Sequence, residues 1–291
     1  MTVFIFGAGT IGLALEVYFQ QHNVEVQLFS NQKVLKRVAP SNPLGVQQYG
    51  NLSTSSPLKR KSSAIITTRI DLLDQISQTR IFQDVQFLLN SKIPVMNFSS
   101  VAVYGDSEEL KSELSTPIPV NLYGRNKLVI EQKLCDLKGA ENLTNLRISN
   151  LFGLAGFRDF TNSTILQISI GEALEIPFED CSRDFIDVST LFKFLLDWVE
   201  TQMNLPHYLN FASNRSYLLT DWASIIADTL KKNLIVDRTF EEHLVNSHID
   251  NSLLRQLWPE PLPDSIDSLK EFLDSLEKYV AIDQSPRRLP T

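Results

Sequence analysis

The sequence has few of the residues that metal centres and disulfide frameworks need. Among 291 residues there are two cysteines, Cys135 and Cys181, and four histidines. Neither cysteine belongs to a paired metal-type motif, and the histidines are scattered without ligand spacing. We therefore expect two free thiols in a reducing compartment and no metal site.

The chain also lacks a surplus of basic residues and any long apolar run. It has 27 Lys and Arg against 34 Asp and Glu, a net charge of −7. Nucleic acids and anionic membranes require a basic face, so we expect neither as a partner. No apolar run reaches the ~20 residues of a membrane span. The first residues, Met-Thr-Val-Phe-Ile-Phe-Gly, read as a strand instead of a signal peptide, so we expect a cytoplasmic protein.

What the sequence does contain is an alternation of strand and helix patterns in its first half. Val3–Phe6 is a short apolar run, Ile11–Gln21 has helical apolar spacing, and Val24–Phe29 alternates like a strand. The elements expected to continue this alternation are strands at 64–68, 95–98 and 143–148 and helices at 71–91 and 122–137. This order predicts an α/β fold with a doubly wound parallel sheet of the Rossmann type.

The second half is less regular and predicts a smaller lobe. The elements expected there are helices at 191–202 and 222–231, a strand at 208–211, and a last helix after the Pro-rich segment 258–263. We expect a dinucleotide-binding Rossmann domain over 1–154, which 184–213 rejoins. The remaining segments, 155–183 and 214–282, would form a C-terminal substrate-binding lobe, and 283–291 a flexible tail.

A glycine-rich turn follows the first expected strand. In Gly7-x-Gly9-x-x-Gly12, the first glycine would make the tight turn, the second would let the backbone approach a pyrophosphate, and the third would let the helix pack on the strand. The helix N-terminus would face the phosphates. The expected cofactor contacts at this turn are Gly7, Gly9, Thr10, Ile11 and Gly12.

The end of the second strand bears on the choice of cofactor. An acidic residue there would bind the ribose hydroxyls of NAD. The sequence instead has Ser30-Asn31-Gln32-Lys33, with Lys36 and Arg37 soon after. The missing carboxylate and the nearby cations favour the 2′-phosphate of NADP, with NAD as the alternative. Ser30, Asn31 and Lys33 are the expected contacts, although the cations could equally form a solvated surface.

A tyrosine and a lysine stand four residues apart on an expected helix. Tyr123 and Lys127 therefore project from one face. A tyrosine hydroxyl has an ordinary pKa near 10, and a nearby ammonium lowers it. Such a tyrosine can donate a proton to a carbonyl oxygen as hydride reaches the carbon. Ser100, just after an expected strand, could hydrogen-bond the same oxygen.

These residues occur within a series of longer motifs. The segments that carry the likeness are Asn97–Gly105, Tyr123–Lys127, Leu146–Gly153, Arg183–Val188 and Tyr208–Ser213. In this order they resemble the extended short-chain dehydrogenase/reductase family, in its NAD-dependent epimerase/dehydratase branch that acts on nucleotide sugars.

The resemblance implies roles for single residues. Tyr123 would be the acid/base, Lys127 would contact the nicotinamide ribose, and Ser100 would bind the reacting oxygen. Asn150 and Arg183 match positions that contact the nucleotide diphosphate of the substrate, although Arg183 could instead pair with a neighbouring aspartate at the surface. The family also implies a homodimer through the helices expected at 71–91 and 122–137.

The sequence departs from the family pattern in four places, one of which is a short region after Gly153 that would trim or open the substrate pocket. In the other three, the glycine motif is one residue shorter, Asp187 replaces a histidine, and Thr67-Thr68-Arg69 replaces a small Ala-rich turn. We expect a reductase that transfers hydride from NADPH to a keto group of a nucleotide-activated sugar. The alternatives are an epimerase or dehydratase with retained NAD, a non-catalytic dinucleotide-binding protein, and an enzyme for another carbonyl compound.

Overall fold

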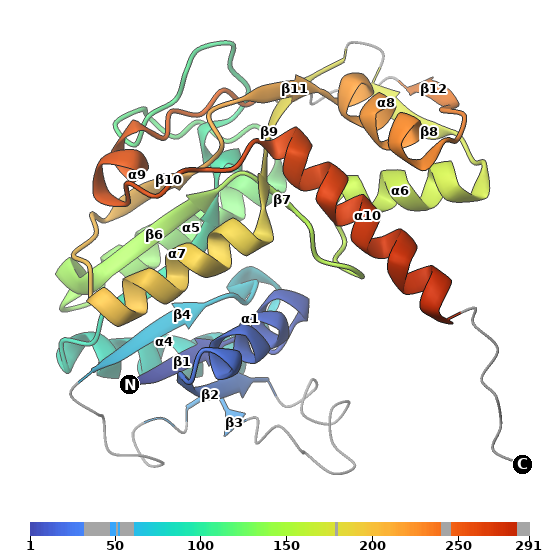
Figure 1. Cartoon of the computed structure of the whole chain (residues 1–291). Helices are drawn as coiled ribbons and strands as arrows, with labels where there is room; N and C mark the ends of the chain where they lie inside the picture. The colour runs from blue at the N-terminus through green and yellow to red at the C-terminus, as the bar shows by residue number, and fades with distance from the viewer. Residues whose placement is uncertain (32–46, 51, 53–60, 178–179, 240–245, 284–291) are drawn as a thin grey trace, which may run out of the picture.

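The central element of the protein is a seven-stranded parallel sheet (Figure 1). The computed structural model describes residues 1–31, 47–50, 52, 61–177, 180–239 and 246–283. The strands of the sheet, in spatial order, are β10 (Tyr208–Phe211), β6 (Leu143–Ile148), β5 (Val95–Ser100), β4 (Ser62–Ile66), β1 (Thr2–Phe6), β2 (Glu25–Ser30) and β3 (Gln47–Gln48). The strand order reverses its direction of growth at β1 and β4, which confirms the doubly wound Rossmann-type fold expected from the sequence.

Both faces of this sheet are covered, which explains the continuous apolar runs of its strands. In β1, Val3 and Ile5 belong to one core, while Phe4 and Phe6 belong to the other. The helices on the first face are α1 (Thr10–Gln21) and α7 (Val188–Thr201), and those on the second are α4 (Gln75–Asn90) and α5 (Leu122–Cys135) (Figure 1). Side chains of alternating direction thus build two cores from one strand.

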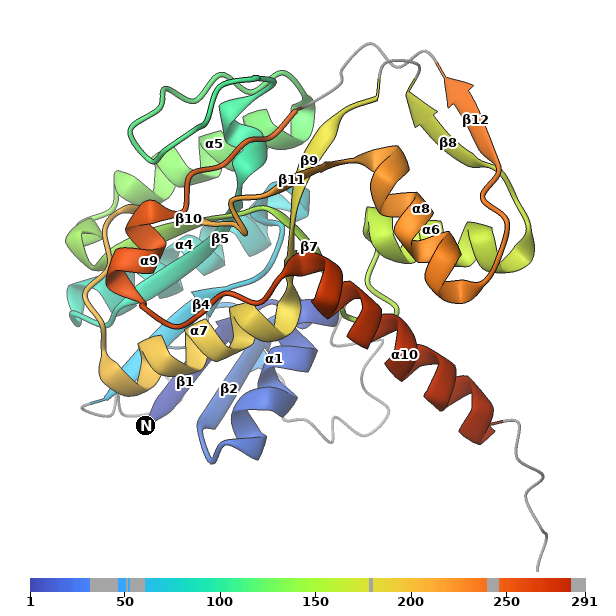
Figure 2. The same ribbon diagram turned by 45° about the horizontal axis from the view of Figure 1, so that its top comes forward.

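The second half of the chain adds a smaller group of elements beside the sheet (Figure 2). Its strands are β7 (Asn150–Phe152), β9 (Ser182–Asp187) and β11 (Ser216–Leu218) in one sheet, and β8 (Leu174–Pro177) and β12 (Val236–Thr239) in another. Its helices are α6 (Phe160–Ile170), α8 (Leu219–Leu230) and α10 (Ser265–Asp283), whereas α9 (Ser252–Leu257) packs beside β10 on the first core of the main sheet. A separate apolar core forms around Trp222, whose ring stacks on Phe185 at 4.1 Å between centroids.

Some element boundaries differ from those expected. The helix expected at 71–91 is divided into a 3-10 turn, η1 (Ile70–Leu72), and α4, because the Asp74 carboxylate accepts a hydrogen bond from the Ser77 backbone and starts a new helix. The Asp187 side chain caps α7 in the same way, so that helix begins three residues before the expected position. Two further 3-10 turns are η2 (Val101–Tyr104) and η3 (Ala140–Asn142).

Within the part of the chain that the structure describes, no helix has the length and apolar character to cross a membrane. The cations Lys33, Lys36 and Arg37 and the tail after residue 283 lie outside the described residues.

Candidate active site

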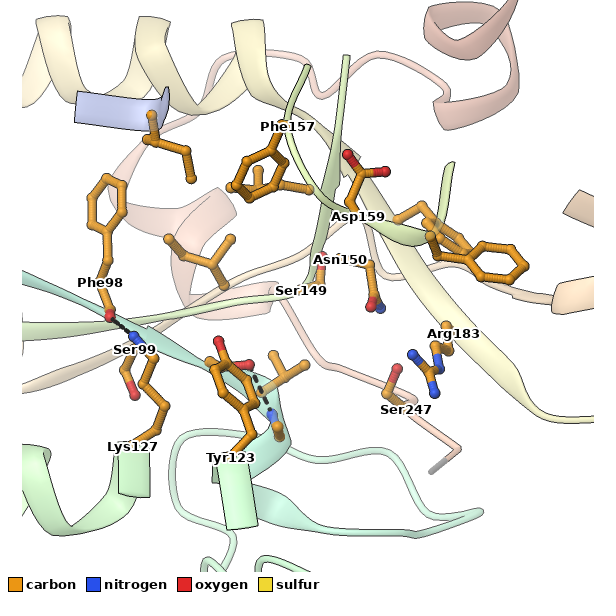
Figure 3. Close-up of a pocket in the computed structure, with 18 of the residues that line it drawn as sticks. Phe98, Ser99, Tyr123, Lys127, Ser149, Asn150, Phe157, Asp159, Arg183 and Ser247 are labelled. Atoms are coloured by element: carbon orange, nitrogen blue, oxygen red, sulfur yellow. Dashed lines mark hydrogen bonds between the residues drawn. The ribbon is translucent and has the colours of Figure 1, made fainter. Parts of the chain in front are cut away.

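A cavity of about 520 Å³ opens at the carboxyl ends of the sheet strands. Its lining runs from Ile11, at the start of α1, past Tyr123 and Lys127 to Arg183 and Ser247. The switch point of a doubly wound sheet is where such folds bind their ligands. Figure 3 shows Tyr123 and Lys127 at one end of the cavity and Arg183 and Ser247 at the other.

The glycine turn borders this cavity and has the shape that a dinucleotide requires. A Cβ atom on Gly12 would lie 1.8 Å from the Gly7 carbonyl oxygen, so α1 can pack this closely only with glycine there. A Cβ atom on Gly9 would meet no atom of the described residues within 4 Å. Gly9 is also the N-cap of α1, where unpaired backbone N–H groups and the helix dipole favour an anion. The space next to Gly9, at the N-terminus of α1, is therefore where a pyrophosphate would bind.

The end of β2 is more enclosed than the sequence suggested. Ser30 is 2% exposed, and its side chain is hydrogen-bonded with the Tyr49 hydroxyl. The Tyr49 backbone N–H also donates to the Ser30 carbonyl at 3.2 Å. Asn31 is half-buried. Asn31 is thus the more accessible of the two polar side chains expected to contact a cofactor ribose.

The helix that carries Tyr123 is held close to Ser100. The Asn121 side chain accepts a hydrogen bond from the Gly124 N–H at 2.8 Å and starts α5. A Cβ atom on Gly124 would lie 2.3 Å from the Ala102 carbonyl oxygen, so only glycine permits this contact between α5 and η2. Ser100 caps η2 by accepting from the Ala102 N–H at 3.2 Å. The two contacts set the phenol of Tyr123 beside the Ser100 hydroxyl.

Lys127 lies one helical turn after Tyr123, with its ammonium group inside the protein. The side chain is 9% exposed, and Nζ donates to the Phe98 carbonyl at 2.7 Å (Figure 3). Burial, followed by the positive charge of Arg69, lowers the pKa of Lys127 to about 8. Part of the Lys127 population is consequently uncharged just above neutral pH.

The cation nearest the ring of Tyr123 is a residue that the sequence reasoning did not assign. The Arg69 guanidinium carbon lies 4.6 Å from the ring centroid, whereas Lys127 Nζ is 5.8 Å away. Burial raises the pKa of Tyr123 above its ordinary value, and the Ser100 hydroxyl and the Arg69 guanidinium oppose that rise. The sequence predicted one cation beside Tyr123, the Lys127 ammonium, and the structure adds a second, the Arg69 guanidinium.

A buried ion pair anchors α5 beneath these residues. Glu131 is fully buried and accepts hydrogen bonds from Arg147 at 2.8 and 3.0 Å and from the Ser99 hydroxyl at 2.5 Å. Arg147 also donates to the Tyr104 hydroxyl at 3.0 Å. Since Ser99 and Arg147 belong to β5 and β6, the network fixes the rotation of α5 and with it the direction of Lys127.

The other end of the cavity has the polar groups expected for the substrate. The Asn150 amide donates to the Asp184 carbonyl at 2.8 Å, and Ser247 lies beside Arg183 (Figure 3). The Nε atom of Arg183 is buried and has no hydrogen-bond partner among the residues that the structure describes. An unpaired buried guanidinium N–H calls for an acceptor such as a phosphate oxygen.

The aspartates that could have paired with Arg183 have other partners. Asp184 is fully buried and accepts from the Ser213 N–H and hydroxyl, both at 2.9 Å, and from the Arg215 N–H at 3.1 Å. Burial raises the pKa of Asp184 to about 6 against these hydrogen bonds. Asp187, where the family pattern has histidine, caps α7. The Asp184 and Asp187 carboxylates are thus engaged with other groups, and Arg183 lines the cavity.

Several cavity residues were not singled out from the sequence. They are Arg69, Asn121, Phe157, Arg158, Asp159 and Ser247. Asn121 had a usable signal, because asparagine before a helical pattern is a common N-cap. Ser247 had none, since it reaches the cavity only through the fold of the second half. For Arg69, the sequence showed the departure from an Ala-rich turn, but it did not show that the guanidinium would lie over the ring of Tyr123.

Comparisons with known proteins show relatives in sequence and in fold. Residues 87–210 match the family model described as the NAD dependent epimerase/dehydratase family. A curated relative, GDP-6-deoxy-D-talose 4-dehydrogenase of Aggregatibacter actinomycetemcomitans, is 26% identical over 193 residues, which are 63% of this chain and 64% of the relative. The match thus spans just under two thirds of that relative's length.

Solved structures share the fold at lower identity. An NAD-dependent NDP-hexosamine 5,6-dehydratase, TunA, superposes with a TM-score of 0.76 at 17% identity, over 95% of this chain and 98% of that one. MoeE5, solved with UDP-glucose and NAD, superposes with a TM-score of 0.74 at 19% identity, over 96% of this chain and 100% of that one. The motif order and the match of residues 87–210 confirm the resemblance to the NAD-dependent epimerase/dehydratase family over that segment, and the superpositions confirm the fold.

Proposed function

We propose that the protein is a reductase that transfers hydride from NADPH to a keto group of a nucleotide-activated sugar, with Tyr123 as the proton donor. The observation that carries the proposal is one continuous cavity. It joins the start of α1, the Ser100, Tyr123 and Lys127 side chains, and the unpaired Arg183 guanidinium. The curated relative is named as a 4-dehydrogenase of a nucleotide-linked deoxysugar, which supports the same type of reaction at carbon 4.

The residues at the glycine turn fit a dinucleotide. Backbone N–H groups of Gly9, Thr10 and Ile11 would hold the pyrophosphate in the space next to Gly9, and Lys127 would hold the nicotinamide ribose. When bound, the nicotinamide supplies the hydride. Asn31 and Lys33 are the residues that we expect to meet the adenosine ribose.

The acid–base work falls to side chains of this chain. Ser100 and Tyr123 would both hydrogen-bond the carbonyl oxygen, which orients the carbon and stabilises charge that develops on the oxygen. Tyr123 donates its proton to that oxygen, and the resulting phenolate is stabilised by the nearby cations. Protonated Lys127, with a pKa of about 8, can then return the tyrosine toward its neutral form near neutral pH.

Substrate binding is assigned to the far end of the cavity. Arg183 would bind the diphosphate through its planar guanidinium, and Asn150 and Ser247 would add hydrogen bonds. This separates the two tasks in space: Tyr123 acts on the sugar, while Arg183 holds the charged part of the same molecule.

The test is an assay with purified protein, NADPH and a panel of 4-keto nucleotide sugars, followed at 340 nm. Turnover with at least one of them is expected, and Tyr123→Phe should lower it by about 10²- to 10⁴-fold. Tyr18→Phe is the matched control, because Tyr18 packs against His22 and Phe192 away from the cavity. The absence of NADPH oxidation with every compound of the panel counts against a reductase.

An epimerase or dehydratase that retains NAD is the second candidate. It is favoured by the solved relatives, since TunA is an NAD-dependent NDP-hexosamine 5,6-dehydratase and MoeE5 was solved with UDP-glucose and NAD. Such an enzyme would carry cofactor through purification and need none added. Protein that elutes empty and requires NADPH supports the reductase, whereas bound NAD(H) released on denaturation and an NADH preference support the second candidate.

We also propose a homodimer through α4 and α5. Both helices carry exposed apolar side chains, among them Ile76, 67% exposed, and Val129, 45% exposed. Burial of such side chains against a second copy would remove them from water. Light scattering at working concentration should give twice the chain mass of 33.0 kDa, and a monomer mass would refute the dimer.

A further inference from the structure

We propose that Arg69 is a positioning residue for Tyr123: held by Asp71, its guanidinium stacks on the phenol ring and favours the phenolate that remains after proton transfer. The inference rests on the proposed acid–base role of Tyr123. It assigns to a residue outside the Ser, Tyr and Lys set a direct effect on the reacting proton.

The guanidinium of Arg69 is fixed in direction. Nε donates to Asp71 Oδ1 at 2.8 Å and Nη2 donates to Oδ2 at 2.6 Å, which makes a bidentate pair. Asp71 also accepts from the Asn126 side chain at 3.2 Å. Because Asn126 lies on α5, next to Lys127, the pair links the turn after β4 to the helix that carries Tyr123.

The fixed guanidinium lies over the ring of Tyr123. Its central carbon is 4.6 Å from the ring centroid, within the range of a cation–π contact. Arg69 also lines the cavity beside Tyr123 and Thr67. A planar guanidinium over an aromatic face adds packing as well as charge, which a lysine at this position would not reproduce.

The charged and polar groups that act on Tyr123 come from four elements. They are Ser100 at the end of β5, Lys127 on α5, Asp71 on η1, and Arg69 before it. Arg69 favours the ionised phenol and Asp71 disfavours it, with the effect of Arg69 the larger. The charges of Arg69 and Asp71 therefore do not cancel at Tyr123, because the positively charged guanidinium lies over the ring.

Arg69 also influences Lys127. After burial, its positive charge is the next cause of the lowered Lys127 pKa of about 8. One guanidinium therefore draws two neighbouring groups toward their deprotonated forms. Arg69 thereby couples the proton donor Tyr123 to Lys127, one turn later on the helix. Arg69 itself lies in a segment where the family pattern has small residues.

The ionisation of Tyr123 can be measured without any substrate. Protein made with 3-fluorotyrosine, whose phenol ionises at lower pH than that of tyrosine, would be titrated by ¹⁹F NMR. The sequence has seven tyrosines, and the signal missing in Tyr123→Phe identifies the relevant one. Arg69→Met should raise its titration midpoint by about one pH unit, a tenfold loss of phenolate at a given pH. Arg69→Lys should raise it by less.

The matched control is Arg125→Met. Arg125 lies on the same helix, is exposed, and donates to the Val120 carbonyl at 2.9 Å. The substitution Arg125→Met also removes one positive charge close to Tyr123 in the sequence, but it leaves the Arg69 guanidinium over the ring. A shift in Arg69→Met with none in Arg125→Met supports the inference. Equal midpoints in the parent and both Arg69 variants, with thermal unfolding unchanged, would overturn it.

A kinetic arm separates this inference from the proposed function. In the direction of reduction Tyr123 must be protonated, so the rate falls as pH rises through its pKa, and Arg69→Met should move that fall to higher pH. A shifted ¹⁹F midpoint without turnover of any keto sugar refutes the reductase and leaves the role of Arg69 standing. Turnover with an unshifted midpoint refutes the role of Arg69 alone.

Discussion

The Gly7 carbonyl oxygen lies 1.8 Å from the point that a Cβ atom on Gly12 would occupy. Gly12→Ala must therefore push α1 away from β1, and we expect a loss of about 3 kcal/mol in the free energy of unfolding. Thermal unfolding with and without NADPH would measure it.

Gly9→Ala is the matched control for that change. Within the described part of the chain its Cβ would meet no atom closer than 4 Å, so the fold should be unaffected. Cofactor binding should weaken at least about tenfold, because the methyl group takes the space next to the proposed pyrophosphate site. Normal affinity for both NADPH and NADH in Gly9→Ala would contradict the assignment of this turn.

Removal of one member of the buried ion pair should be costly. Glu131→Gln leaves the Arg147 charge buried without its counter-charge, and we expect a loss of about 3–5 kcal/mol in urea unfolding. Glu260→Gln, which breaks the exposed pair with Lys193, should cost less than about 1 kcal/mol. A loss of similar size in both variants would show that α5 is not anchored through Glu131.

Arg183 should control substrate affinity more than turnover. Arg183→Met should raise KM for a nucleotide sugar at least about tenfold with a smaller effect on kcat, because the guanidinium binds the part of the substrate that does not react. Arg183→Lys should recover only part of the affinity. Arg255→Met, an exposed arginine on α9, is the control. An unchanged KM in Arg183→Met would move the diphosphate site elsewhere.

Asp184 should make stability depend on pH. Its pKa of about 6 in the folded protein lies above the ordinary 3.8, so the folded state binds the proton more tightly. The stabilisation is complete below pH 4 and is lost as pH rises to 6. This difference between the folded-state pKa and the ordinary pKa corresponds to about 3 kcal/mol in the free energy of unfolding. Urea unfolding between pH 4 and 7 should show this decline in the parent and not in Asp184→Asn, and parallel curves would contradict it.

The parts of the fold that could be predicted are those written locally in the chain. Apolar runs such as Val3–Phe6 and the helical spacing of Ile11–Gln21 predict buried strands and a helix, because side-chain direction repeats every two or 3.6 residues. Tyr123 and Lys127 were predictable for the same reason, since four residues bring both to one helix face. Short strands such as β7 and β11 have too few residues for a period to appear.

The parts that could not be predicted depend on distant contacts. Arg69 reaches Tyr123 across 54 positions of sequence, and only the sheet brings the turn after β4 next to α5. Ser30 appeared to be a cofactor contact at the end of a strand, yet Tyr49 covers it. Neither the contact of Arg69 with Tyr123 nor that of Ser30 with Tyr49 produces a residue spacing that can be recognised in the sequence.

The contacts between residues distant in sequence that build the cavity have a consequence for biosynthesis. The Asp184 N–H donates to the Ser247 hydroxyl at 3.3 Å, so the position of Ser247 in the far wall of the cavity depends on a contact between residues that are synthesised 63 positions apart. A nascent chain that has emerged through residue 200 already holds the glycine turn and Tyr123, but not Ser247. Contacts of such high sequence separation form slowly. The ability to hold a nucleotide sugar should consequently arise as one of the final events of maturation, after the glycine turn and the tyrosine helix have been made.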